Sequence, residues 1–356
     1  MSAAVSAQNV GATNMYRCSP RQVREFMVEC LYEGLIPCVL GSPGIGKSAI
    51  NHSICDELNL HLIDHRAAGS DPADYNGIPD VSGGVATFAP FQDVFPIAST
   101  PVPDGKDGFY LFLDEINSTG RAVQAALYKL LLDKKTGQHP LHPNTVLAAA
   151  GNLATDRAIV NSISTALQSR VIWLEMTLDG HEEEFIQDIA LKQGWDHRII
   201  GYLSRYPGKL MDFKPDHQDK TFCCPRTWEF MNRLVKGKDI PESKVALYAG
   251  TITSGVAVDF VQFAKVYTTL IDVKEVVKDP TGTAVPNDNT LMWATVTHLM
   301  DKVEASNFEK ISTYMSRFPM DFTVLFFRAV GSRLPHLKTH PAMRQAKLKL
   351  AKYLND

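Results

Sequence analysis

The sequence lacks both a long apolar run and an excess of charge of one sign. No stretch approaches the ~20 consecutive apolar residues that a membrane-spanning helix needs, so we expect no membrane span. The 36 Lys and Arg residues nearly balance the 39 Asp and Glu residues, which gives a net charge of -3. Proteins that hold nucleic acid by its phosphates are usually basic, so nucleic acid is possible as a partner but not favoured.

Cysteine is scarce and is poorly spaced for metal or disulfide chemistry. The 6 cysteines form no C-x-x-C pair, and no cluster of histidines completes a zinc set. Cys223 and Cys224 are adjacent, a poor geometry for a disulfide. We therefore expect buried, reduced cysteines and a cytoplasmic protein.

Internal repeats and low-complexity tracts are also missing. The 356 residues are 45% hydrophobic and 21% charged, an ordinary globular composition that is long enough for about two domains. Residues 1–14 are small and polar and do not show the charged-then-apolar pattern of a signal peptide. We expect a disordered tail over residues 1–18.

The first half of the chain alternates short apolar runs with helical patterns. The helical patterns begin at Ser19, Ala49 and Gly120. The apolar runs, each too short for a helix, are 36–40, 61–63, 109–113, 145–150 and 171–176. Buried strands that alternate with helices predict an α/β fold with a parallel sheet, which we place over residues 19–178.

Residues 68–103 interrupt this alternation with six prolines. Within them, Ser82-Gly83-Gly84 separates two short apolar segments, which predicts a hairpin. Apolar arms beside a small, flexible tip suit the gripping of a protein segment. Alternatively, Phe88 and Phe91 pin the segment to the core.

After Leu178 the strand signal fades and helical patterns dominate, notably at 180–193 and 228–235. Residues 274–289 contain Pro280, Gly282 and several charges, which indicates a linker or loop. A last helix is expected to begin at Pro341 and to end near Leu354.

Residues 41–48, GSPGIGKS, match the phosphate-binding pattern GxxxxGK[ST] between an apolar strand and a helix, as that pattern requires. In such a loop the backbone N–H groups and the helix N-terminus bind the phosphates. Lys47 would reach the β- and γ-phosphates, and Ser48 would hold Mg²⁺.

Two further strands end in polar residues that complete this chemistry. Residues 111–113 lead into Asp114 and Glu115, and residues 148–150 lead to Asn152. Strand ends in a parallel sheet share one edge with the ligand site. Asp114 would support Mg²⁺, Glu115 would polarise the attacking water, and Asn152 would orient that water or touch the γ-phosphate. A turn Asn is the alternative for Asn152.

The order of these motifs resembles that of AAA+ ATPases. The motif Asp-Glu-Ile-Asn at 114–117, together with the proline-rich hairpin insertion, resembles the MoxR family in particular. The resemblance covers about residues 19–236. It implies a helical lid, which we place over 179–273; beyond residue 236 the chain shows only helical patterns, and we expect a C-terminal helical extension over 274–356. The resemblance also implies an arginine finger at Arg170 and a sensor 2 residue at Arg226. The resulting candidate nucleotide-binding residues are Gly41, Ser42, Pro43, Gly44, Ile45, Gly46, Lys47, Ser48, Ala49 and Arg226; the catalytic candidates are Glu115, Asn152 and Arg170, and the metal ligands are Ser48 and Asp114.

Two positions depart from the MoxR pattern: Ser118 stands where Arg is usual, and Ser169 stands where Asp usually precedes the finger. Lys129, Arg157 and Arg121 are rival trans-acting cations. A surface salt bridge is the alternative role for Arg170. An ordinary Pro-Arg helix start is the alternative for Arg226.

The resemblance implies an ATPase that uses ATP and Mg²⁺, assembles as a homo-oligomeric ring of six, and remodels a protein partner, often one with a von Willebrand factor A domain. Three alternatives remain open on the sequence. They are a nucleic-acid motor or helicase loader, a nucleotide-gated switch with little turnover, and a small-molecule kinase. The near balance of charges disfavours the nucleic-acid motor, and an intact Glu115 disfavours a switch with little turnover. The presence of both Arg170 and Arg226 disfavours a small-molecule kinase.

Overall fold

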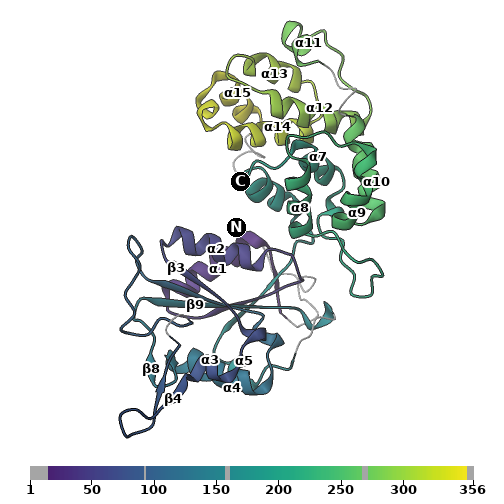
Figure 1. Cartoon of the computed structure of the whole chain (residues 1–356). Coiled ribbons are helices and arrows are strands. Elements are labelled where there is room, and N and C mark those ends of the chain that lie inside the picture. The colour runs from purple at the N-terminus through teal and green to yellow at the C-terminus, as the bar shows by residue number, and fades with distance from the viewer. Residues whose placement is uncertain (1–14, 92–93, 157–160, 267–271, 351–356) are drawn as a thin grey trace. The chain divides into compact units, whose positions relative to one another are not determined.

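The computed structural model describes residues 15–91, 94–156, 161–266 and 272–350 (Figure 1). The chain divides into two compact units, residues 1–178 and 179–356. The division of the second unit into a lid and an extension stays a prediction.

The first unit is built on a parallel sheet with the strand order β1-β10-β2-β9-β6-β3. Its strands are β1 (Arg17–Cys18), β2 (Pro37–Leu40), β3 (His61–Arg66), β6 (Phe109–Asp114), β9 (Thr145–Gly151) and β10 (Ile172–Met176). Every residue of β2 and β6 is buried, as expected for strands covered on both faces. The predicted α/β class with a parallel sheet followed by helices is confirmed.

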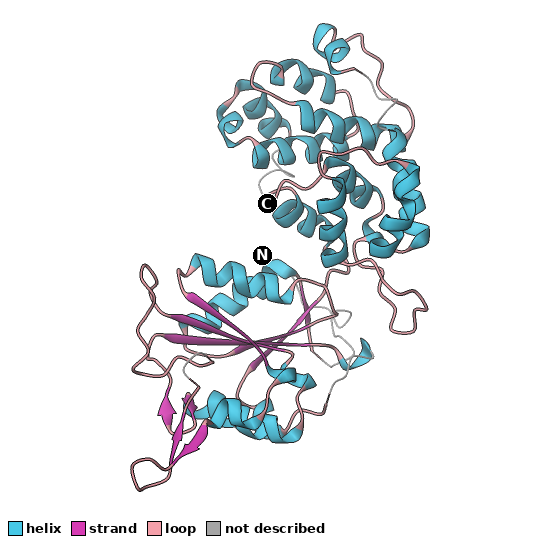
Figure 2. Ribbon diagram, in the orientation of Figure 1, coloured by secondary structure: helices cyan, strands magenta, loops and turns pink. Residues whose placement is uncertain are grey.

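Helices cover both faces of this sheet (Figure 2). On one face lie α1 (Pro20–Tyr32) and α2 (Lys47–Glu57), and on the other lie α3 (Pro72–Asn76), α4 (Arg121–Asp133) and α5 (Thr165–Gln168). Helix α1 begins where the sequence predicts, because Ser19 and Gln22 form a reciprocal capping box. Leu127 and Leu130 of α4 are fully buried in one apolar cluster with Leu111 and Leu113 of β6, so this face of the sheet carries a continuous core.

The expected tail over residues 1–18 is wrong at its end. Residues 1–14 lie outside the described residues, but Arg17 and Cys18 form β1 and pair in parallel with Glu175 and Met176. The Arg17 Nε donates to Glu175 Oε1 at 3.3 Å. These two residues are ordered because they form the edge strand of the sheet and pair with β10, which lies much later in the sequence.

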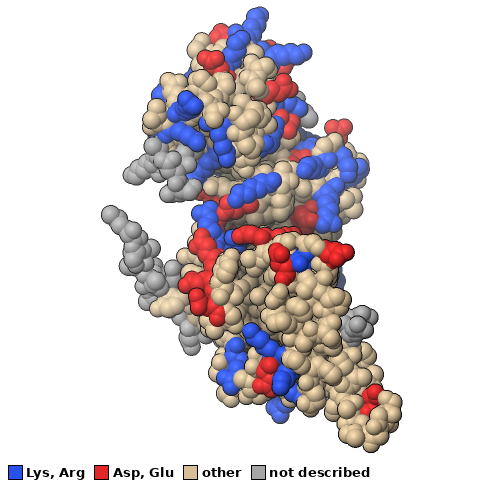
Figure 3. All heavy atoms as spheres, turned by 90° about the vertical axis from the view of Figure 1, so that its left-hand side faces the viewer, with Lys and Arg blue, Asp and Glu red and all other residues tan. Residues whose placement is uncertain are grey.

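The predicted hairpin forms from β4 (Ile78–Asp80) and β5 (Thr87–Ala89), which pair antiparallel. A second hairpin, β7 (Lys135–Thr136) with β8 (His139–Pro140), contacts its base, since His139 Nε2 lies 2.8 Å from Phe88 O. Val81 (69% exposed) and Val85 (72%) flank the tip Ser82-Gly83-Gly84, while Phe88 is 40% exposed. The lowest part of the first unit in Figure 3, where this hairpin lies in Figure 1, carries few charges.

Among its described residues the second unit consists of helices joined by loops, with one isolated β-bridge between Asp212 and Cys223. Its helices are α6 (Glu182–Phe185), a π-helical turn at Ile186–Ala190, α7 (His197–Arg205), α8 (Pro225–Val235), α9 (Val245–Ile252), α10 (Ser254–Val266), α11 (Val273–Lys278), α12 (Asn289–Lys302), α13 (Phe308–Met315), α14 (Met320–Arg333) and α15 (Pro341–Lys349). The expectation of a linker over 274–289 is wrong for α11, which Asp272 caps by accepting from the Lys274 N–H. Helix α15 begins at Pro341 as predicted.

No helix in the described part of the chain is long and apolar enough to cross a membrane. All six cysteines lie in that part and are buried, as expected.

Candidate nucleotide-binding site

The candidate site lies where three neighbouring parallel strands end. Strand β9 lies between β2 and β6, with Leu40 in register with Gly151 and Leu113 in register with Ala149. The phosphate-loop residues, Asn152, and the pair Asp114-Glu115 follow or end these strands, so all three segments come to one edge of the sheet.

The loop between β2 and α2 needs glycine at specific points. Gly44 has φ 78° and Gly46 has φ 113°, both in the left-handed region that glycine tolerates. A Cβ on Gly41 would lie 3.2 Å from Met176 O and 3.3 Å from Ile45 Cγ2. Gly46 is the N-cap of α2, and no described side chain caps that first turn. The helix therefore presents its N–H groups to the space before it.

Lys47 connects the loop to the neighbouring strand. Its Nζ donates to Gly41 O at 2.7 Å, to Ser42 O at 3.1 Å and to Asn152 Oδ1 at 3.1 Å. The side chain is buried, at 8% exposure. The cation is thus held across the loop by oxygen acceptors, beside the N-terminus of α2.

Ser48 and Asp114 bring two oxygen donors together from different elements. The Ser48 Oγ donates to Asp114 Oδ2 at 3.2 Å, and the other oxygen of Asp114 accepts from the Glu115 N–H at 2.9 Å. Asp114 is the last residue of β6 and is buried. Both groups are hard oxygen ligands, the type that Mg²⁺ prefers.

Glu115 follows Asp114 in an unusual conformation. Its φ of 56° and ψ of 35° lie in the left-handed region, which costs a residue with a Cβ about 1–2 kcal/mol. The carbonyl of Glu115 accepts from the Ser118 N–H at 2.9 Å. Because the chain turns sharply at Glu115, this residue leaves the line of strand β6. It is partly exposed, whereas the preceding Asp114 is buried.

Asn117 is a site neighbour that the sequence does not assign a role. Its Nδ2 donates to Asn152 O at 2.7 Å, and its Oδ1 accepts from the Asn152 N–H at 3.0 Å. The only sequence signal for it is its place in the Asp-Glu-Ile-Asn motif, two residues after Glu115.

The residues present fit a nucleotide phosphate with Mg²⁺. A positive-φ glycine loop, an uncapped helix N-terminus and Lys47 offer the donors that phosphate requires. Ser48 and Asp114 offer two oxygens, and Mg²⁺ bound with phosphates needs only one or two protein ligands. No group of three or more His, Cys, Asp or Glu side chains that could hold a metal occurs among the residues that the structure describes.

The candidate arginine finger is exposed. Arg170 lies after α5, with its guanidinium carbon 5.8 Å from the centre of the Tyr128 ring. Among its rivals, Arg121 is exposed at the start of α4 and Lys129 is partly exposed on the same helix. Arg157 lies outside the described residues.

Arg226 belongs to the second unit, so its relation to the loop at 41–48 stays a prediction. It is the second residue of α8, follows Pro225 and is exposed. Trp228, two residues later, is fully buried in that unit. The sequence therefore identifies the helix correctly, while the role of its arginine is untested.

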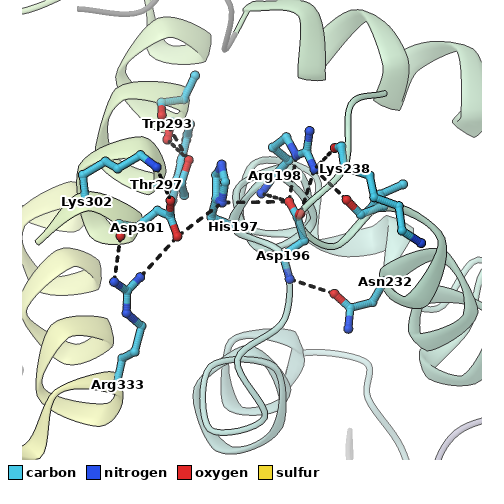
Figure 4. Close-up of polar contacts among 12 residues, drawn as sticks. Asp196, His197, Arg198, Asn232, Lys238, Trp293, Thr297, Asp301, Lys302 and Arg333 are labelled. Atoms are coloured by element: carbon cyan, nitrogen blue, oxygen red, sulfur yellow. Dashed lines mark hydrogen bonds and ion pairs between the residues drawn. The ribbon is translucent and has the colours of Figure 1, made fainter. Parts of the chain in front are cut away.

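The second unit contains its own polar network, centred on Asp196 and Asp301 (Figure 4). Arg198 donates to both oxygens of Asp196 at 2.8 Å, and His197 Nδ1 lies 4.0 Å from Asp196 Oδ1 and from Asp301 Oδ1. Burial acts to raise the pKa of Asp196, but the bonds and charge of Arg198 outweigh it and hold that pKa below its usual range. Burial lowers the pKa of His197. The negative charges of Asp196 and Asp301 act to raise this pKa, but burial has the larger effect.

Comparisons with known proteins concern the fold. No protein-family model and no curated protein sequence matches this chain. Among solved structures, NtrX from Brucella abortus in complex with ADP is 12% identical with a TM-score of 0.36, over 94% of this chain and 68% of NtrX. A point mutant of RuvB from Thermotoga maritima is 17% identical with a TM-score of 0.40, over 86% of this chain and 90% of RuvB. A full-length MCM homolog from Methanopyrus kandleri is 16% identical with a TM-score of 0.27, over 39% of this chain and 29% of that protein.

These identities and TM-scores are low, and none of the similarities singles out the MoxR family. The roles of individual residues therefore rest on the geometry above. The chain itself combines a parallel sheet of order β1-β10-β2-β9-β6-β3 with a helical unit that follows, which is an α/β fold.

Proposed function

We propose that this chain is a Mg²⁺-dependent AAA+ ATPase of the MoxR type, which hydrolyses ATP and uses the energy to remodel a protein partner. One observation carries the proposal. Lys47 in the phosphate loop contacts Asn152, and Ser48 contacts Asp114, so the ends of β9 and β6 both contact the first turn of the helix that follows β2. Each contact joins two segments that lie far apart in the sequence and that have different roles in phosphate binding in this proposal.

In this proposal the residues divide the work of phosphoryl transfer. Lys47 and the N–H groups of the loop bind the phosphates, and Glu115 accepts a proton from the attacking water at its carboxylate. Asn152 orients that water or the γ-phosphate. The bound Mg²⁺, held by Ser48 and supported by Asp114, would screen the phosphate charge.

The proposal includes a homo-oligomeric ring of six, with ATP between subunits. Arg170 would act on the ATP of the neighbouring subunit, where an arginine stabilises charge on the transferred phosphoryl group. The exposure of its side chain supports this role. Arg226 would contact the nucleotide from a helical lid.

A protein partner, for instance one with a von Willebrand factor A domain, fits the exposed hairpin better than nucleic acid does. Val81 and Val85 beside its tip are largely exposed, and Phe88 and Phe91 retain 40% and 36% exposure, so neither ring is buried as an anchor. Apolar side chains held out on a hairpin favour contact with another protein. The net charge of -3 gives no general attraction to phosphates.

The test is ATP binding and steady-state hydrolysis with and without Mg²⁺, in the wild-type protein and two variants. Lys47→Ala should lose ATP binding, because the ground-state phosphate contact is gone. Glu115→Gln should bind ATP and hydrolyse it very slowly, because the carboxylate acts only during the reaction. Normal turnover by Glu115→Gln would contradict the assignment, and tight binding without turnover by the wild type would instead identify a nucleotide-gated switch.

A further inference from the structure

The side chain of Asn117 forms a two-point bridge between the loop after β6 and the end of β9. Its amide accepts from the Asn152 N–H and donates to the Asn152 carbonyl, so both backbone groups of one residue are satisfied by one side chain. At 3% exposure, Asn117 is shielded from water. Buried hydrogen bonds of this kind are costly to break, because the freed groups lose access to solvent.

A second observation shows that the chain makes room for this bridge. Gly151, the last residue of β9, has no side chain, and a Cβ there would lie 2.6 Å from Asn117 Oδ1 and 2.8 Å from its Cγ. Gly151 has no positive φ to require glycine. Close approach of the Asn117 amide is therefore the reason for glycine at this position.

The bridge reaches the phosphate loop through one further contact. Asn152 Oδ1 accepts from Lys47 Nζ at 3.1 Å, so the position of that oxygen depends on a backbone that Asn117 holds. Asn117 also lies on the same short turn as Glu115, three residues after Asp114. One buried amide thus fixes the distance between the acidic turn and the Asn152 side chain.

We infer that Asn117 is a positioning residue for ATP hydrolysis. It fixes the positions of Asn152 and of the Glu115 turn relative to each other and does not itself touch the nucleotide. The inference rests on the proposed function. Displacement of reacting groups by about 1 Å can cost about 100-fold in rate while leaving ground-state binding largely intact. A positioning role therefore predicts a loss in kcat and little change in ATP affinity.

The matched control is Asn161, which also braces this turn. The Asn161 Nδ2 donates to Thr119 O at 2.9 Å and its N–H donates to Asn117 O at 2.8 Å. Within the described part of the chain, the bonds of its side chain go to the carbonyls of Ser118 and Thr119 and not to Asn152. Asn161→Ala therefore removes a brace of the loop and keeps the bridge.

The experiment compares the wild type, Asn117→Ala and Asn161→Ala for ATP affinity, kcat and unfolding midpoint, in the full chain with Mg²⁺. Asn117→Ala should lower kcat by about 10- to 100-fold and change the ATP Kd by less than about threefold. Asn161→Ala should keep kcat within about twofold of wild type. An unchanged kcat in Asn117→Ala overturns this inference alone, whereas a wild type that does not hydrolyse ATP overturns the proposed function and this inference with it.

A third variant decides the matter if Asn117→Ala fails to fold. In Asn117→Asp one carboxylate oxygen can still accept from the Asn152 N–H. The other oxygen has no hydrogen to donate, so the bond to the Asn152 carbonyl is lost and two acceptors face each other. Protonation restores the missing donor, so the kcat of Asn117→Asp relative to wild type should rise as the pH falls. A ratio that is flat with pH would overturn the bridge as the cause.

Discussion

Lys47 Nζ lies 3.1 Å from Asn152 Oδ1, which joins the lysine of the phosphate loop to the end of the neighbouring strand across 105 residues of sequence. An amide oxygen accepts from the ammonium group without neutralising its charge. The contact places the Lys47 ammonium group where the proposal requires phosphate to bind.

Asn152→Asp should weaken ATP binding, by about tenfold or more, because a carboxylate beside Lys47 would compete with phosphate for the same cation. Asn152→Ala, which removes the acceptor and adds no charge, should change affinity less and lower kcat more. Titration of a fluorescent ATP analogue, paired with steady-state turnover, separates the two effects. Equal affinities in both variants would contradict this account of Lys47.

Gly151→Ala should destabilise the first unit by about 1–3 kcal/mol, since the new Cβ would overlap the Asn117 amide at 2.6 Å. Gly69→Ala is the control in the same unit, because a Cβ there meets nothing within 4 Å. Chemical denaturation of both variants measures the difference. A Gly151→Ala protein as stable as Gly69→Ala would show that the turn after β6 moves aside freely.

Local patterns predict those parts of the fold that depend on neighbouring residues. The spacing of the phosphate loop identifies it, and apolar runs such as 109–113 identify the buried strands, since both signals are contained in a few consecutive residues. Strand β1 is missed because two residues, Arg17 and Cys18, carry no period, and their partner strand lies 158 residues away at Glu175. The short helix α11 is missed because nearby Pro280 and Gly282 dominate the local signal.

The candidate site shows the same division. Asp114, Glu115 and Asn152 are predictable individually because each follows an apolar run. The bond between Asn117 and Asn152 joins residues 35 apart, and an asparagine after a strand is locally indistinguishable from a turn residue. Contacts of this kind depend on strand order, which a single sequence does not specify.

The second unit should lose stability as the pH falls, in two stages. His197 and His298 have pKa values lowered by burial, so the unfolded chain takes up protons first, and stability declines below about pH 6.5. Asp196 and Asp301 have pKa values held below the usual range, and their contribution is lost below about pH 4.

His197→Gln tests the first stage. Each proton taken up preferentially by the unfolded chain costs up to about 1.4 kcal/mol per pH unit, so the variant should lose less stability than wild type between pH 7 and about pH 5.5. Urea denaturation followed by tryptophan fluorescence provides the measurement, with Trp173→Phe in both proteins, because the other three tryptophans, Trp195, Trp228 and Trp293, lie in this unit. An identical pH slope in the two proteins would exclude His197 as a contributor.

Arg170 should act across a subunit interface. Arg170→Ala and Lys47→Ala should each be inactive alone, and mixing them should restore part of the turnover, because some interfaces then pair an intact Arg170 with an intact Lys47. The loss in Arg170→Ala should reach about 10³-fold. Arg121→Ala, another exposed arginine of the first unit, should keep its activity. Mixed assemblies that exchange subunits and recover no turnover would contradict a role in trans, and sedimentation with an ATP analogue should reveal the ring.

The β4–β5 hairpin should be needed for work on a partner and not for ATP turnover. Val81 and Val85 are exposed, so Val81→Ser with Val85→Ser removes apolar surface from the tip without opening a cavity in the core. The paired strands and the contact between His139 and Phe88 are left intact, so the base of the hairpin should keep its place.

The double variant should keep wild-type folding, assembly and basal hydrolysis, and should lose remodelling of the protein that co-purifies with the ATP-trapped Glu115→Gln form. Tyr32→Ser is the control: Tyr32 is 76% exposed at the end of α1, so this change also removes exposed apolar surface, but away from the hairpin. If both variants remodel the partner equally well, the hairpin is not the gripping element. If the double variant instead loses stability or basal hydrolysis, the exposed valines serve the fold and not the gripping of a partner.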